Sequence, residues 1–198
     1  MHRLAAVAAL AAACLASPAA EALPVTYHAI LTGAAEAPPN TSPATGSATV
    51  TIDTLAYTLS VQASFSGLEG VATAAHIHCC TAVPQDGTAG VASQVPSFAG
   101  FPLGGASGSY DMTFDLLAPS SWNPAFLNAN FGSTTDATAK LAEGLAEGTA
   151  YFNLHSSIYP SGEIRGFLTE VPEPAALALF ATGLAGLAAT RRRPIAKI

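Results

Sequence analysis

Basic residues are scarce in the central part of this chain. Of its seven lysines and arginines, only Lys140 and Arg165 lie between residues 23 and 170. Eleven aspartates and glutamates fall in the same stretch, which gives it a net charge near −9. Because lysine and arginine supply most of a protein's affinity for phosphate backbones, this balance excludes a role in binding nucleic acid.

Signatures of catalysis are missing as well. The chain has no nucleophile elbow, no Ser/His/Asp order, no glycine-rich phosphate loop and no pair of acids at a set spacing. We therefore expect a protein that is not an enzyme. The stretch 23–170 suits a single domain with a sizeable core, and no sequence repeat divides it.

The first 22 residues have the order of a secretory signal peptide. Positive charge at Arg3 precedes an apolar run over 4–16, and small residues at Ala20 and Ala22 predict cleavage by signal peptidase before Leu23. This order predicts that the domain after it is exported. The alternative interpretation of residues 1–22 is a buried helix.

A second targeting pattern occupies residues 171–198. It consists of Val171, Pro172, Glu173 and Pro174, an apolar run over 175–190, and then Arg191, Arg192 and Arg193. The prolines prevent a helix from entering the run, and about 16 helical residues reach only ~24 Å, which predicts a short transmembrane helix. The three arginines would hold their end on the cytoplasmic side. The alternative is an ordinary membrane anchor.

This order resembles the PEP-CTERM sorting signal of Gram-negative bacteria. The resemblance implies that an exosortase, a membrane transpeptidase-like protease, processes the protein at or near residues 171–174. It also implies transient anchoring in the inner membrane. Since such tails accompany biofilm-forming, exopolysaccharide-producing bacteria, the expected destination is the periplasm, the outer envelope or the extracellular matrix.

Apolar residues of the central domain recur mostly with period two. Alternating runs cover 49–53, 55–63, 110–116, 150–154 and 164–168, and further strands are expected at 24–31 and 71–78. About seven strands bounded by glycine, proline and serine predict an all-β sandwich. Helical spacing replaces the alternation only over about 136–147, which predicts one short crossover helix with a helical turn from Asn123-Pro124 before it.

Three motifs in this domain resemble the CHRD domain, named for chordin. They are the opening Leu31-Thr32-Gly33-Ala34-Ala35-Glu36-Ala37-Pro38-Pro39, the central Ala75-His76-Ile77-His78, and the closing 151–155 (YFNLH) with 160–166 (PSGEIRG). The resemblance spans residues 27–169 and implies an immunoglobulin-like β-sandwich or barrel. The activity of the family is poorly understood, so the resemblance implies a fold more than a function.

Histidines carry the main chemical hypothesis. His76 and His78 are two residues apart on a predicted strand, so their imidazoles point to the same side, with Cα atoms about 6.7 Å apart. That spacing lets both rings reach one metal ion. His155 is polar where its strand neighbours Phe152 and Leu154 are apolar, so we expect it on a polar face too.

Two charged residues are expected to join these histidines. If 150–155 and 163–168 form a hairpin, His155 lies close to Glu163, and Arg165 points to the same side. The glutamate would then orient or neutralise an imidazole from outside the ligand shell.

Three interpretations of this cluster stay open. In the first, it is a structural network in which the histidines bind backbone carbonyls and Arg165 pairs with Glu163. In the second, His76, His78 and His155 bind copper or zinc, since imidazoles suit both ions. An H-x-H strand in a Greek-key sandwich is similar to copper–zinc superoxide dismutase, an analogy at the level of the fold only. The third is a redox or hydrolytic enzyme.

Cys79 and Cys80 are the only cysteines between residues 23 and 170. Export places them where disulfides persist. Neighbouring Cα atoms lie closer than in most disulfides, so a vicinal bridge would be strained and would form a rigid turn. We favour this bridge over two free thiols, and the alternative is ligation of a soft metal beside His78.

Taken together, these patterns predict an exported, non-enzymatic surface or matrix protein. Adhesion is its expected role, through loops on a rigid sandwich that contact exopolysaccharide or an envelope protein. A copper- or zinc-binding domain is the second hypothesis.

Overall fold

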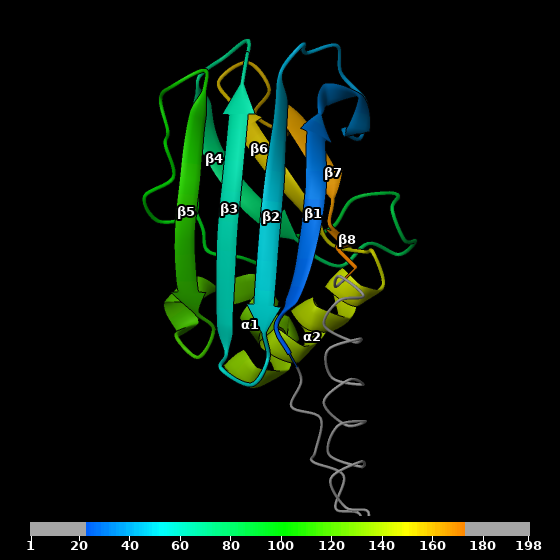
Figure 1. Cartoon of the computed structure of the whole chain (residues 1–198), viewed down its shortest axis with the longest axis vertical. Coiled ribbons are helices and arrows are strands. Elements are labelled where there is room, and N and C mark those ends of the chain that lie inside the picture. Colours follow the sequence, from blue (N-terminus) through cyan, green and yellow to red (C-terminus); the bar gives the residue numbers. More distant parts are fainter. Residues whose placement is uncertain (1–22, 173–198) are drawn as a thin grey trace, which may run out of the picture.

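The protein is a single antiparallel sheet of eight strands within residues 23–172, which the computed structural model describes (Figure 1). The strands are β1 (Val25–Thr32), β2 (Thr45–Asp53), β3 (Thr58–Ser66), β4 (Ala72–His78), β5 (Gly108–Asp115), β6 (Tyr151–Ser156), β7 (Ile164–Phe167) and β8 (Thr169–Glu170). Their order is β4-β6-β7-β1-β2-β3-β5, with β8 beside β1. The sheet curls into a half-barrel, so that β4 and β6 lie behind β3 and β5 (Figure 1). The predicted all-β fold is confirmed.

The open side of the half-barrel is covered by the segment between β4 and β5. Its backbone binds the free edge of β4, where Ala92 N–H donates to Ile77 O at 2.9 Å and Gly104 N–H donates to Ala72 O at 2.8 Å. Covering an edge in this way prevents it from pairing with another chain.

The core fills the concave side of the sheet. Side chains alternate along each strand, and the inward ones are apolar; Val50, Val61, Phe152, Leu154 and Ile164 are all fully buried. Burial of this face is the main source of stability, because apolar surface leaves water.

Two helices close one end of the half-barrel (Figure 1). The helical segments are η1 (Gly33–Ala35), η2 (Pro119–Ser121), α1 (Pro124–Ala129) and α2 (Thr134–Ala146). The predicted crossover helix is α2, which begins after Ser133, whose hydroxyl accepts from Asp136 N–H at 3.1 Å. It buries Leu141 and Leu145 and ends before Gly148, whose φ of 68° favours glycine.

The convex side of β4, β6 and β7 is also largely buried, but by polar residues. His76, Asn153, Glu163 and Arg165 are each less than 7 % exposed there. Loops 33–42 and 85–97 supply contacts to these side chains, so a polar layer lies between the sheet and its loops.

Both predicted targeting ends fall largely outside the described residues. The signal peptide (1–22) and the sorting segment from Glu173 onward, including Arg191 to Arg193, belong to the parts that the structure does not describe. Within 23–172, no helix is both long enough and apolar enough to cross a membrane.

Candidate metal centre

Strands β4 and β6 bring three histidines together on the convex side of the sheet. His76 lies opposite Asn153 and His78 opposite Tyr151, while His155 pairs with Ala74 at the next position along β6. Ring centroids are 5.9 Å apart for His76 and His78, 5.2 Å for His76 and His155, and 6.1 Å for His78 and His155. The structure therefore brings together all three predicted ligands.

One nitrogen of each ring is bound to a backbone carbonyl. His76 Nε2 lies 2.8 Å from Pro96 O, His78 Nδ1 lies 2.9 Å from Ala89 O, and His155 Nδ1 lies 2.9 Å from Pro160 O. A carbonyl only accepts hydrogen bonds, so each of these nitrogens carries the proton and donates. Three separate loop positions thus fix the tautomer of three imidazoles.

The other nitrogen of each ring is buried and has no hydrogen-bond partner. These atoms are His76 Nδ1, His78 Nε2 and His155 Nε2. A ring nitrogen of each histidine lies within 4.8 Å of one from each of the others. Three nitrogens that share an ion at ~2.0–2.1 Å are about 3.4–3.6 Å apart, so the rings would move closer together by up to roughly 1.4 Å to hold one.

Burial keeps the three imidazoles neutral. It lowers the pKa of His76 to about 4 despite the hydrogen bond to Pro96, and the pKa of His78 to about 4 despite that to Ala89. It also lowers the pKa of His155. At neutral pH each unprotonated nitrogen therefore keeps its lone pair, which is the form that binds metal.

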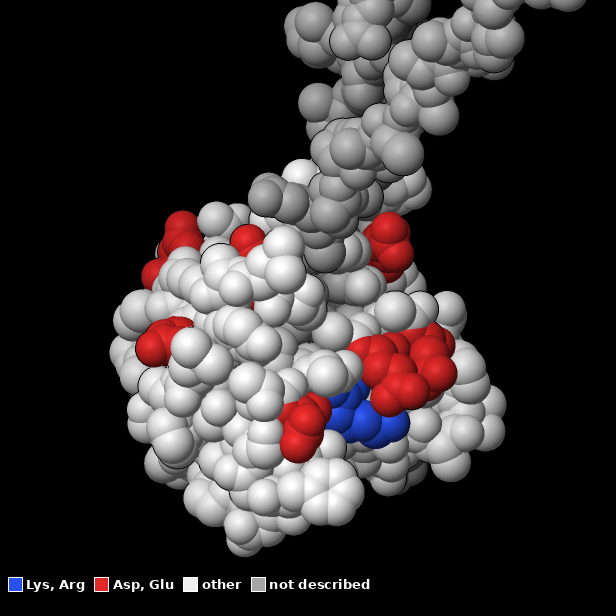
Figure 2. Space-filling view, turned by 90° about the horizontal axis from the view of Figure 1, so that it is seen from below, with Lys and Arg blue, Asp and Glu red and all other residues white. Residues whose placement is uncertain are grey.

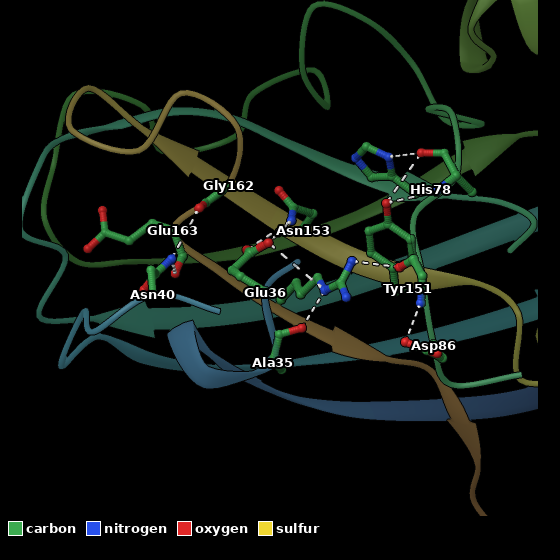
Figure 3. Close-up of polar contacts among 12 residues, drawn as sticks. Ala35, Glu36, Asn40, His78, Asp86, Tyr151, Asn153, Gly162 and Glu163 are labelled. Carbon is green, nitrogen blue, oxygen red and sulfur yellow. Dashed lines mark hydrogen bonds and ion pairs between the residues drawn. The ribbon is translucent and has the colours of Figure 1, made fainter. Parts of the chain in front are cut away.

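Tyr151 and Arg165 support His78 from the neighbouring strands. The Tyr151 ring stacks on His78 with centroids 4.7 Å apart, and its hydroxyl donates to Ala89 O at 3.3 Å. The guanidinium carbon of Arg165 lies 4.8 Å from the centre of the Tyr151 ring, and Arg165 Nη1 donates to Gly87 O at 3.0 Å. Together they position the loop whose Ala89 carbonyl orients His78 (Figure 3).

The partner of Arg165 is Glu36, which the sequence motif contained but our prediction did not assign. Glu36 lies 3.9 Å from Arg165 Nε and accepts from Asn153 Nδ2 at 2.9 and 3.1 Å (Figure 3). Burial raises the pKa of Glu36 to about 7, against the lowering influence of Arg165. Arg165 therefore pairs with Glu36 and not with Glu163, the partner that the structural-network interpretation gave it. A buried arginine needs a carboxylate, and the acid of the opening motif was the available signal.

Glu163 joins loops and does not contact the imidazoles. Its Oε1 accepts from Ser42 Oγ and from Glu69 N–H, both at 2.7 Å, although its backbone pairs with Leu154 as the predicted hairpin requires. The prediction that Glu163 orients a histidine is therefore wrong. Backbone carbonyls orient the histidines instead.

Cys79 and Cys80 are joined by a disulfide on the helix side of the sheet. Both sulfur atoms lie against α2 so closely that a Cβ at Gly144 would collide with them. Since Cys79 follows His78 on the strand, it points inward where His78 points outward. The sulfurs are thus separate from the histidine cluster, which is the only group of potential metal ligands found within 23–172.

Comparison with known proteins agrees with this architecture. The model of the PEP-CTERM protein-sorting motif matches residues 170–193, so this is an exported, envelope-targeted protein that an exosortase-type enzyme processes. No curated protein and no solved structure matches the chain. The model of the CHRD domain matches residues 27–168, which include most of β1, all of β2 to β7 and all three clustered histidines. The chain belongs to the CHRD domain family.

Proposed function

We propose that this exported protein is a non-catalytic metal-binding domain that holds one copper or zinc ion through His76, His78 and His155. The observation that carries the proposal is a cluster of three histidines, each with one buried, unprotonated nitrogen that has no hydrogen-bond partner, and with ring nitrogens within 4.8 Å of one another. Imidazole nitrogens are ligands that suit both metals.

A purely structural network explains only half of this arrangement. It accounts for the bonds from the three histidines to Pro96, Ala89 and Pro160. It leaves three buried acceptors unpaired, at roughly 1–3 kcal/mol each. A shared metal ion would satisfy all three at once, and the carbonyls then act as the outer support that metal-binding histidines commonly have.

Metal analysis tests the proposal directly. We expect the protein, purified without a polyhistidine tag, to hold one copper or zinc ion per chain, and a His76→Ala/His78→Ala variant to lose it. His28→Ala is the matched control, because His28 lies on β1 outside the cluster. Absence of bound metal in wild type after loading with either ion, with unchanged thermal stability, would refute the proposal.

A second candidate role is contact with a neutral exopolysaccharide or an envelope protein. Hydroxyl side chains dominate the convex face of β2 and β3, including Thr49, Ser47 and Ser64, beside a shallow hollow that Gln62 and Asp111 also line. Such a face offers hydrogen bonds with little charge. Retention of the protein on purified exopolysaccharide tests this role, and elution in the void volume contradicts it.

We further propose that the protein is transiently anchored in the inner membrane. Processing near residues 171–174 would release the domain into the periplasm, the outer envelope or the extracellular matrix, with the apolar run 175–190 left in the membrane.

A further inference from the structure

The histidine cluster lacks compensating negative charge. Within residues 23–172 the ion pairs are Lys140–Glu143 and Arg165–Glu36, and no carboxylate comes within 4 Å of an imidazole nitrogen. Acids beside a divalent ion offset its charge, whereas three neutral imidazoles leave it uncompensated.

The two buried acids of the polar layer have other partners. Glu36 is bound to Asn153 and Arg165, while Glu163 binds Ser42 Oγ and Glu69 N–H through Oε1, and its Oε2 is buried without a hydrogen-bond partner. Neither carboxylate has a hydrogen bond to His76, His78 or His155 within the described chain.

A buried positive charge, paired with Glu36, lies near the cluster. Arg165 lies over Tyr151, and Tyr151 stacks on His78, so the guanidinium is separated from the cluster by one aromatic ring. Arg165 is only 4 % exposed, so water screens its charge weakly. A cation between the histidines would therefore be repelled by this arginine, and a dication would be repelled twice as strongly as a monocation.

We infer that this site is built for a monovalent soft cation, Cu(I), in preference to Zn²⁺ or Cu²⁺. The inference rests on the proposed function. The cost of burying an ion grows with the square of its charge, so a dication among three neutral ligands costs about four times as much as a monocation. Nitrogen ligands exclude the alkali ions, which are hard cations that prefer oxygen.

A dication at this site needs an anion from outside the protein. Carboxylates are not at hand, and the ligand nitrogens are themselves out of contact with solvent. Hydroxide or chloride would have to enter with the dication. The net charge of the two together would then equal that of Cu(I).

Charge variants of Arg165 test this selectivity. The whole chain, purified in detergent without a polyhistidine tag, is titrated with Ag⁺ as a redox-inert substitute for Cu(I), and separately with Zn²⁺. Arg165→Gln removes a positive charge that one aromatic ring separates from His78, which should tighten Zn²⁺ binding about tenfold more than Ag⁺ binding. Arg165→Lys keeps the charge and should leave the ratio of the two affinities unchanged.

Glu36→Gln is the variant of opposite sign. At pH 8, where Glu36 is ionised, it removes the negative partner of Arg165 and should shift the ratio toward Ag⁺, so the test survives if Arg165→Gln fails to fold. Equal changes for both ions in these variants, or tighter binding of Zn²⁺ than of Ag⁺ by wild type, would overturn the inference while leaving the metal site intact. If wild type binds neither ion, the proposed function itself fails.

Discussion

At the level of single residues, backbone carbonyls orient the clustered histidines, which is the role that acids have in many metal sites. Pro96 O, Ala89 O and Pro160 O each accept a hydrogen bond from one ring nitrogen, which fixes the direction of the other nitrogen. Because carbonyls carry no net charge, they orient the rings without adding to the charge of the cluster. The groups that orient the three rings are therefore not the groups that set the charge around them.

Glu36 should make stability depend on pH in a characteristic direction. Its pKa is raised to about 7 in the folded state, whereas an unfolded glutamate titrates near 4.5. Between these values the folded protein holds a proton that the unfolded chain has lost, so stability falls as pH rises.

We expect the free energy of unfolding of wild type, relative to Glu36→Gln, to fall by about 2 kcal/mol between pH 5 and pH 8. Urea unfolding at several pH values measures it. The histidines titrate in both proteins, so their contribution cancels in the difference. Parallel pH profiles for the two proteins would show that Glu36 titrates normally.

The sequence predicted the three histidines of the cluster but not their surroundings. Strand alternation places His76, His78 and His155 on one side of the sheet, because side-chain direction follows from position along a strand. Glu163 has the right parity as well, yet its carboxylate turns to Ser42 and Glu69. Which loop contacts a side chain depends on residues far apart in the sequence. Strand alternation gives no information about such contacts.

At the level of elements, the contact between β7 and β1 brings two backbones close together. Thr32 pairs with Arg165, and a Cβ at Gly166 would collide with the backbone carbonyl of Ile30. Backbone atoms at this contact move only if the strands separate. Glycine at 166 therefore allows β7 to join the sheet.

Replacing Gly166 by alanine should destabilise the protein by roughly 2–4 kcal/mol, because a buried clash with backbone has no flexible side chain to yield. The midpoint of urea unfolding measures the loss. Gly90→Ala is the control, since a Cβ there meets nothing within 4 Å. Equal midpoints for the two variants would contradict the account of this contact.

Strands and the crossover helix were predictable because their periodicity is local. The predicted helix over 136–147 corresponds to α2 (Thr134–Ala146), and each predicted strand has its counterpart. The segment 79–107 was not predictable, since its irregular backbone follows no period and takes its shape from the edge of β4. Two of the carbonyls that orient the histidines, those of Ala89 and Pro96, come from this segment.

At the level of the whole molecule, the surface is weakly charged and acidic. Figure 2 shows the end that carries α1 and α2, where basic atoms form one small patch beside acids and most of the face is uncharged. Lys140 pairs with Glu143 at 2.8 Å and is the one exposed basic residue within 23–172. This face therefore offers little positive charge to a phosphate backbone.

Sorting should depend on the motif at the C-terminal boundary of the domain. Replacing Pro172, Glu173 and Pro174 by alanine should leave an unprocessed precursor in the membrane fraction, because the exosortase-type enzyme loses its recognition sequence. Intact-mass measurement on exported and membrane fractions detects the difference. A mature protein of the same mass, changed only by the substitutions themselves, would contradict the assignment of the processing site.

X-ray absorption spectroscopy of the copper-loaded protein tests the central claim most directly, because it reports which atoms surround the ion. Ligation by His76, His78 and His155 predicts three nitrogen neighbours near ~2.0 Å with the multiple scattering of imidazole. The number of nitrogen neighbours and the imidazole scattering should fall in His155→Gln, which keeps two of the three ligands, and should stay unchanged in His28→Ala. Sulfur neighbours near ~2.3 Å, or a shell of water oxygens alone, would contradict the account.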